Sequence, residues 1–178
     1  MSEALEWFKI VLACVLAAIV YGVLHDQITA RICVEYFTIG HPPVFATEDP
    51  TLLGLGWGVI ATWWVGLILG IGLAGASRLG KRPKRTLAES RAPIAILLAS
   101  MAVIALLAGL IGNAAARSGG VVLVGPLASE VPEAAHVGFI ADLWAHLASY
   151  ISGFLGGVVV LVWTWRQRKP DSSAAPVE

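Results

Sequence analysis

Four long apolar segments constrain this chain more than any other feature of its sequence. They cover about residues 7–24, 52–76, 93–116 and 143–165. The hydrocarbon core of a bilayer is about 30 Å thick and takes about 20 apolar residues as a helix. Only 13% of the 178 residues are charged, whereas soluble domains carry about 25%. The sequence therefore predicts an all-α membrane protein, a bundle of four transmembrane helices with the lipid bilayer as its surroundings.

The distribution of Lys and Arg predicts the orientation of this bundle, because cytoplasmic loops hold the excess of these residues. Residues 77–92 hold six of the 12, the tail after residue 165 holds three, and Lys9 adds one. The other two loops hold only Arg31 and Arg117. Both termini are therefore expected in the cytoplasm, and residues 25–51 and 117–142 on the outer side of a bacterial inner membrane.

The charge balance and the N-terminus complete this outline. Twelve acidic residues balance the 12 basic ones, so no basic surface for nucleic acid is expected. The first apolar segment follows Glu3 and Glu6 and lacks a small-residue cleavage site, so it is predicted to be a retained helix and not a signal peptide. We expect one membrane domain over residues 1–170 and a disordered tail over residues 171–178.

Small residues recur every four positions in the second and fourth apolar segments. This spacing places them on one side of a helix, where they allow two helices to approach closely. The two helices that pack together would belong to the same chain, to two copies of it in a homo-oligomer, or to this chain and another membrane subunit. The positions are Gly54, Gly58, Thr62, Gly66, Gly70, Ser149, Gly153 and Gly157.

Ionisable residues concentrate in the segments expected on the outer side. All four histidines lie there or just inside the last apolar segment. Imidazole and carboxylate groups are common metal ligands and proton carriers. Because a charge in hydrocarbon is costly, such groups turn toward the bundle interior. The candidate polar cluster consists of His25, Asp26, Arg31, Glu35, His41, His136, Asp142 and His146.

The outer segments are predicted to form a small ordered cap. From Gln27 onward polar and apolar residues alternate, which favours an extended or β segment over residues 27–39. A helical continuation with Arg31 and Glu35 paired at i,i+4 is the alternative. Residues 121–124, between two glycine-containing turns, predict a second extended piece that pairs with the first. Pro132 and Glu133 indicate a helix start, so the last helix is expected to begin outside the membrane.

The run HDQITARICVEYFTIGHPPVF, with PTLLGLGWGVIATWWVG after it, resembles a signature of small bacterial multi-pass membrane proteins. The resemblance covers about residues 25–66, a quarter of the chain. It implies a bacterial source and a membrane location. It implies no activity and no residue roles.

Several functions fit these residues. In the first, hydrogen bonds from the polar cluster tie the outer loops to the bundle of an assembly, binding or sensing protein. In the second, a transition metal or a proton is held by His25, Asp26, Asp142 and His146, with His41 or His136 completing the site. In the third, a redox protein, His25 and His146 ligate a haem beside Trp63 or Trp64.

Two further functions are less favoured. A transporter or channel would use the polar side of the last span and Asn113, but the inner halves of the spans lack ionisable residues for a continuous path. A hydrolase would use Ser149 or Cys33 as its nucleophile, and neither has a neighbouring base at a fixed spacing. The sequence therefore favours assembly, binding or sensing over catalysis.

Overall fold

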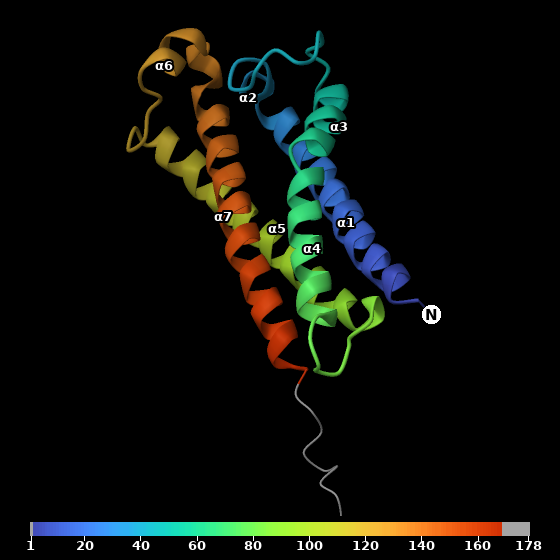
Figure 1. Cartoon of the computed structure of the whole chain (residues 1–178). Coiled ribbons are helices and arrows are strands. Elements are labelled where there is room, and N and C mark those ends of the chain that lie inside the picture. Colours follow the sequence, from blue (N-terminus) through green and yellow to red (C-terminus); the bar gives the residue numbers. More distant parts are fainter. Residues whose placement is uncertain (1, 169–178) are drawn as a thin grey trace, which may run out of the picture.

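The computed structural model describes residues 2–168, and these residues form helices and loops without a strand. Figure 1 shows their order along the chain. The predicted tail of residues 171–178 lies outside the described residues. The elements are α1 (Glu3–Ile32), α2 (Val34–Thr38), α3 (Pro50–Ile60), α4 (Trp63–Arg78), α5 (Leu87–Arg117), α6 (Pro126–Glu130), the 3-10 helix η1 (Glu133–Ala135) and α7 (His136–Arg166).

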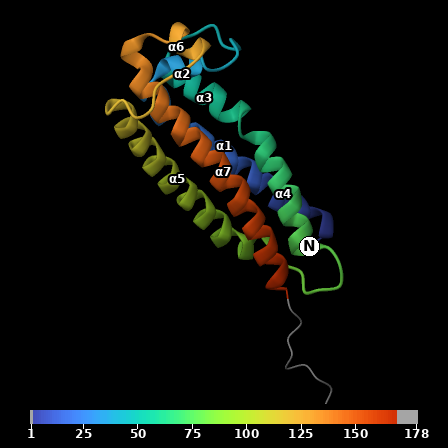
Figure 2. The same cartoon turned by 90° about the vertical axis from the view of Figure 1, so that its left-hand side faces the viewer.

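The long helices make two antiparallel pairs that pack side by side. In one pair α1 contacts α3 and α4, and in the other α5 contacts α7, while α4 and α7 join the pairs (Figures 1 and 2). The described ends of the chain lie at one end of the bundle, which we call the terminal end. The short helices and their loops, residues 33–49 and 118–135, lie at the other end and are called the cap.

Four helical segments are long and apolar enough to cross a membrane: Glu3–Ile32, Pro50–Arg78, Leu87–Arg117 and Glu133–Arg166. Their outward faces carry large exposed apolar side chains, including Leu24, Ile68, Leu106 and Val159. In water such a surface would be strongly unfavourable, whereas in lipid it needs no cover. The prediction of an all-α bundle with four spans is confirmed at this level.

The predicted extended segments are wrong. Residues 27–32 continue α1, the backbone becomes extended only at Cys33, and α2 follows at once. The helical alternative is confirmed for residues 27–32, but Arg31 does not pair with Glu35. Its guanidinium donates to Gln27, one helical turn earlier, and to the hydroxyl of Thr51. Residues 121–124 also form no strand. A short alternation of polar residues therefore does not override a helix whose i,i+4 side chains find partners.

The small residues of α3 and α4 lie against α1. A Cβ on Gly58 would lie 2.5 Å from the Cα of Val23, and one on Gly66 would lie 2.8 Å from the Cα of Val15. Because these neighbours are backbone atoms, a side chain at either position would force the helices apart. This small-residue face is therefore filled by α1 of the same chain. On α7, the equivalent residues Gly153 and Gly157 face side chains of α5 and α4.

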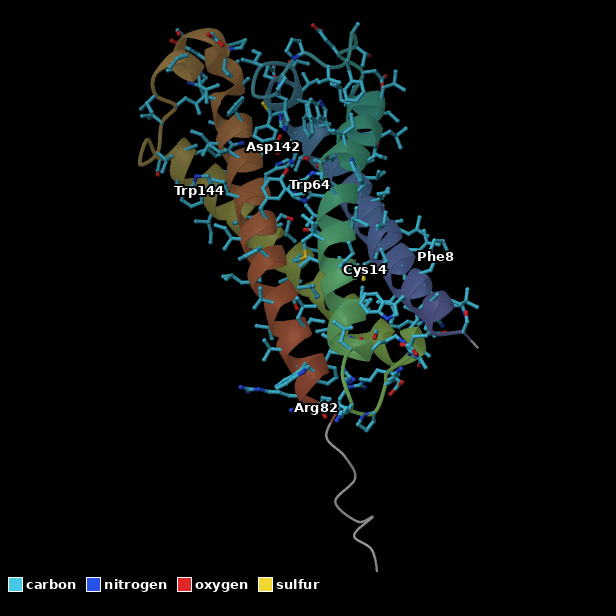
Figure 3. All side chains as sticks on the ribbon, viewed as in Figure 1. Phe8, Cys14, Trp64, Arg82, Asp142 and Trp144 are labelled. Carbon is cyan, nitrogen blue, oxygen red and sulfur yellow. The ribbon has the colours of Figure 1, made fainter. Side chains whose placement is uncertain are left out.

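At the terminal end, Arg168 joins the end of α7 to the loop between α4 and α5. Its side chain is only 2% exposed and donates to four backbone carbonyls, those of Ala76, Leu79, Arg82 and Pro83. Figure 3 shows Arg82 at this end of the bundle. The loop between α4 and α5 is thus held by hydrogen bonds, which leaves few ways for α4 and α7 to shift at this end.

Candidate functional site

Two histidines and an aspartate meet between α1 and α7, in the half of the bundle nearest the cap. One ring nitrogen each from His25 and His146 and a carboxylate oxygen of Asp26 all lie within 4.8 Å of one another. Asp26 is 5% exposed and His146 is 4% exposed. We call these three residues the His–Asp–His cluster. His25 and Asp26 are neighbours on α1, and His146 on α7 follows Asp26 by 120 residues. Helix packing alone brings their ligand atoms together.

The hydrogen bonds of His146 determine which of its ring nitrogens faces the cluster. Its Nδ1–H donates to the backbone carbonyl of Asp142, one turn earlier on α7, at 2.8 Å. Its Nε2 lies 3.3 Å from a carboxylate oxygen of Asp26. In neutral imidazole with the proton on Nδ1, Nε2 carries a lone pair. A lone pair facing a carboxylate is unfavourable, so a proton or a metal ion is required between the two groups.

Two other buried groups in this region have no hydrogen-bond partner among residues 2–168. They are Nε2 of His25 and both carboxylate oxygens of Asp142, a residue with no exposed surface. The backbone N–H of Cys33, which donates to the carbonyl of Thr29, also lies close enough to the Asp142 carboxylate to interact with it. Figure 3 shows Asp142 on α7 toward the cap. Buried polar atoms are normally paired, so these atoms call for a partner such as a water molecule, a proton or an ion.

Aromatic side chains surround the cluster. The ring of His146 lies 4.5 Å from that of Tyr36 and 5.8 Å from that of Phe37, both on α2. Tyr36 and Phe37 in turn contact His41, whose ring is 4.5 Å from that of Trp57. Burial raises the pKa of the Tyr36 hydroxyl, so this phenol stays protonated near neutral pH. Rings of α2 therefore cover His146 on the side of the cap, while His25 stays partly exposed.

Several residues of the predicted polar cluster serve the cap instead. Arg31 joins α1 to α3 through Thr51. His41 Nδ1 pairs with the carbonyl of Tyr36, and His136 Nε2 pairs with the carbonyl of Val131, both at 2.9 Å. Glu35 accepts from the thiol of Cys33 at 3.3 Å. These contacts hold the loops in shape and lie outside the His–Asp–His cluster. Asp142 adjoins that cluster without belonging to the three residues that share it.

A second layer under the cluster is not evident in the sequence. The hydroxyl groups of Tyr21 and Ser149 share a hydrogen bond between α1 and α7. The Tyr21 ring also stacks on His25, with ring centroids 5.9 Å apart. Tyr21 precedes His25 by four residues and Ser149 follows His146 by three, which is one turn of a helix in each case. This one-turn spacing from each histidine is the feature of the sequence that could have pointed to Tyr21 and Ser149, although either residue alone is common in membrane helices.

The geometry argues against the haem and hydrolase alternatives. The rings of His25 and His146 meet edge to face with centroids 4.5 Å apart, which leaves no layer between them for a porphyrin. Burial raises the pKa of the Cys33 thiol to about 12, so the thiolate needed for nucleophilic attack is scarce. The hydroxyl of Ser149 is paired with Tyr21 and not with a base.

The cap is expected to loosen below pH 6.5 because burial lowers the pKa of His41 from that ordinary value. Above pH 6.5 the ring is neutral in both the closed and the open cap. Below it, the open cap takes up a proton that the closed cap resists, so acid favours opening. Hydrogen exchange of residues 33–49, corrected for intrinsic rates, should show more opening at about pH 5 than at about pH 7.5.

The control for this experiment is the variant His41→Gln. Its amide can keep the hydrogen bond to the Tyr36 carbonyl but has no proton to gain. The difference between the two proteins therefore reports on the proton that His41 takes up. Equal pH dependence in the two proteins would show that the cap does not respond to this residue.

Comparisons with family models, with curated proteins and with solved structures found no match to the chain. The resemblance of residues 25–66 to small bacterial membrane proteins stays a prediction. The geometry and charge of the His–Asp–His cluster therefore carry the inference of a function.

Proposed function

We propose that this chain is a membrane protein that binds one divalent transition-metal ion between α1 and α7. The observation that carries the proposal is the convergence of three ligand atoms, from His25, Asp26 and His146, within 4.8 Å of one another. Two imidazoles and a carboxylate form a donor set that suits zinc, iron and similar ions. His25 also contributes a buried nitrogen without a partner among the described residues.

The electrostatic balance of the region supports a divalent cation. Asp26 and Asp142 are both buried, and within residues 2–168 neither forms an ion pair with Lys or Arg. Ionised, they place two negative charges in a low-dielectric region, where each costs a few kcal/mol even on lenient insertion scales, so either a proton or a cation has to compensate them. One divalent cation with two neutral imidazoles would make the region neutral. Asp142 would act mainly through its charge, since its oxygens lie outside the group of three.

The surroundings of His146 support the same proposal. Metal-binding histidines usually donate their second ring N–H to a carbonyl or carboxylate, which fixes the tautomer and the direction of the ring. The bond from Nδ1 to the Asp142 carbonyl is of this kind. The aromatic rings of α2 would shield the bound ion from bulk water and from competing ligands.

Binding or sensing is favoured over transport. Below the Tyr21–Ser149 pair, α7 presents Gly153 and Gly157, which face the side chains of Met101 and Leu69. Ion conduction needs a continuous series of polar or hydrated sites. The apolar contacts here separate the His–Asp–His cluster from the buried Ser77 and Ser90 at the terminal end. We therefore propose that the ion enters from the cap end and leaves by it.

The orientation follows from the basic residues. The terminal end carries Arg78, Lys81, Arg82, Lys84 and Arg85, so it is proposed to face the cytoplasm of a bacterial cell. The cap and the metal site would then face the outer side. The occupancy of the site would then vary with the metal concentration on the outer side. Such a dependence fits a sensing or assembly role for an ordered cap.

Loading the purified chain with metal tests the proposal. The protein, with any polyhistidine tag removed, is incubated with Zn²⁺ and passed through a desalting column, and its metal content is measured by mass spectrometry. We expect about one zinc per chain. With Co²⁺ in place of Zn²⁺, visible absorption bands should report nitrogen and oxygen ligation. A chain that retains no zinc and gives no cobalt bands contradicts the proposal and leaves a shared proton between Asp26 and His146 as the alternative.

A further inference from the structure

A long apolar groove runs along the membrane-facing side of α5 and α7. Its volume is about 940 Å³. Small residues open it: Ser100 on α5, and Ala148, Ser152 and Gly156 at intervals of four on α7. Its walls include Ile96 and Val159, which are 66% and 65% exposed. The groove therefore faces lipid and lies apart from the His–Asp–His cluster.

The length of the groove matches one leaflet of a bilayer. On α5 its lining runs from Ala92 to Ile104 and on α7 from Ala148 to Trp163, and these twelve and fifteen steps at 1.5 Å each give about 18 and 22 Å. One leaflet is about 15 Å thick in its hydrocarbon part and about 20–22 Å with its headgroups. A lipid acyl chain in one leaflet fits this length. A partner helix that crosses the whole membrane would need a longer groove.

Positive charge gathers where the groove reaches the terminal end. Trp163 lines the groove there, and the Arg85 guanidinium lies over its ring, 5.3 Å from the centroid. The Arg82 guanidinium lies over a different ring, that of Trp165, which does not line the groove. Glu89 pairs with Arg85 at 3.5 Å, and the exposed Arg166 follows Trp163 by three residues, so it adds positive charge on the groove side of α7. Tryptophan and arginine at this depth are typical of a headgroup region.

We propose that this groove binds an anionic phospholipid, with an acyl chain between α5 and α7 and the phosphate beside Arg85 and Arg166. The apolar walls supply contact for the chain. The two guanidinium groups supply the preference for negative charge. The site is independent of the proposed metal site and of which side of the membrane the terminal end occupies.

Native mass spectrometry of the full chain tests this site. The protein is exchanged into detergent with equal amounts of phosphatidylglycerol and phosphatidylcholine of the same chain length. We expect about tenfold more bound phosphatidylglycerol. The double variant Arg85→Gln, Arg166→Gln should bind the two lipids about equally. Arg117→Gln, at the opposite end of α5, is the charge control and should keep the preference.

Filling the groove should remove both lipids. Ser152→Phe fills it from α7 and Ser100→Phe fills it from α5, so one variant suffices if the other fails to fold. Val158→Phe is the size control, because Val158 lies on α7, is exposed and is not part of the groove. Equal binding of the two lipids by the unmodified chain would overturn the proposal. So would a dimer that Ser152→Phe or Ser100→Phe dissociates, since the groove would then hold a second copy.

Discussion

Replacing His146 with alanine is expected to lower the affinity of the chain for Zn²⁺ by about a hundredfold or more. The change removes one nitrogen ligand of the proposed site and the bond that orients it toward Asp26. Loss of an outer-shell partner alone typically costs 10- to 100-fold in metal affinity, and loss of a direct ligand costs at least as much. Isothermal titration calorimetry of the tag-free protein with Zn²⁺ measures the change in affinity.

The matched control is His136→Ala on the same helix. The His136 ring bonds to the carbonyl of Val131 and lies outside the His–Asp–His cluster, so its loss should leave the Zn²⁺ affinity unchanged. Thermal unfolding of both variants without metal separates loss of binding from loss of fold. If His146→Ala does not fold, His25→Ala replaces it in the same comparison. Equal affinity in the unmodified chain and in His146→Ala or His25→Ala would contradict the metal site.

The bundle could be predicted from the sequence because the bilayer imposes a length and a composition that no soluble fold shares. The structure of the cap could not be predicted in this way. Its segments are too short to show a clear helical or strand periodicity, and the alternation after Gln27 fitted a strand as well as the end of a helix. The decisive contacts join distant segments, such as Arg31 to Thr51 and Tyr36 to His146. No local pattern encodes them.

The same limit applies to the candidate site. Sequence reasoning could place His25, Asp26 and His146 inside the bundle at similar depth, because a charge that faces lipid is costly. The sequence could not give the rotation of α1 about its axis, and the contact between Asp26 and His146 depends on that rotation. That rotation is determined by the backbone contact of Gly58 and Gly66 with α1. The packing of small residues therefore positions the site.

The variant Gly58→Ala is accordingly expected to destabilise the bundle by about 1–3 kcal/mol, the usual cost of overpacking a close interface. The new Cβ would lie 2.5 Å from the Cα of Val23 and 2.6 Å from its nitrogen, and neither backbone atom can move without shifting α1. Alanine is a better helix former than glycine by about 1 kcal/mol. A loss of stability would thus appear despite the gain in helix propensity. Unfolding in mixed micelles with increasing dodecyl sulfate measures it.

Gly75→Ala, in the same membrane-spanning segment, separates the two effects. Its Cβ would meet Leu79 at 3.4 Å and Trp7 at 3.9 Å, which are ordinary contacts with side chains. Helix propensity then acts alone, and the free energy of unfolding should stay equal or rise slightly. If Gly58→Ala is as stable as Gly75→Ala, α1 does not approach α3 this closely. If it is less stable, the same shift of α1 should also weaken Zn²⁺ binding, because Asp26 follows Val23 by one turn of the helix.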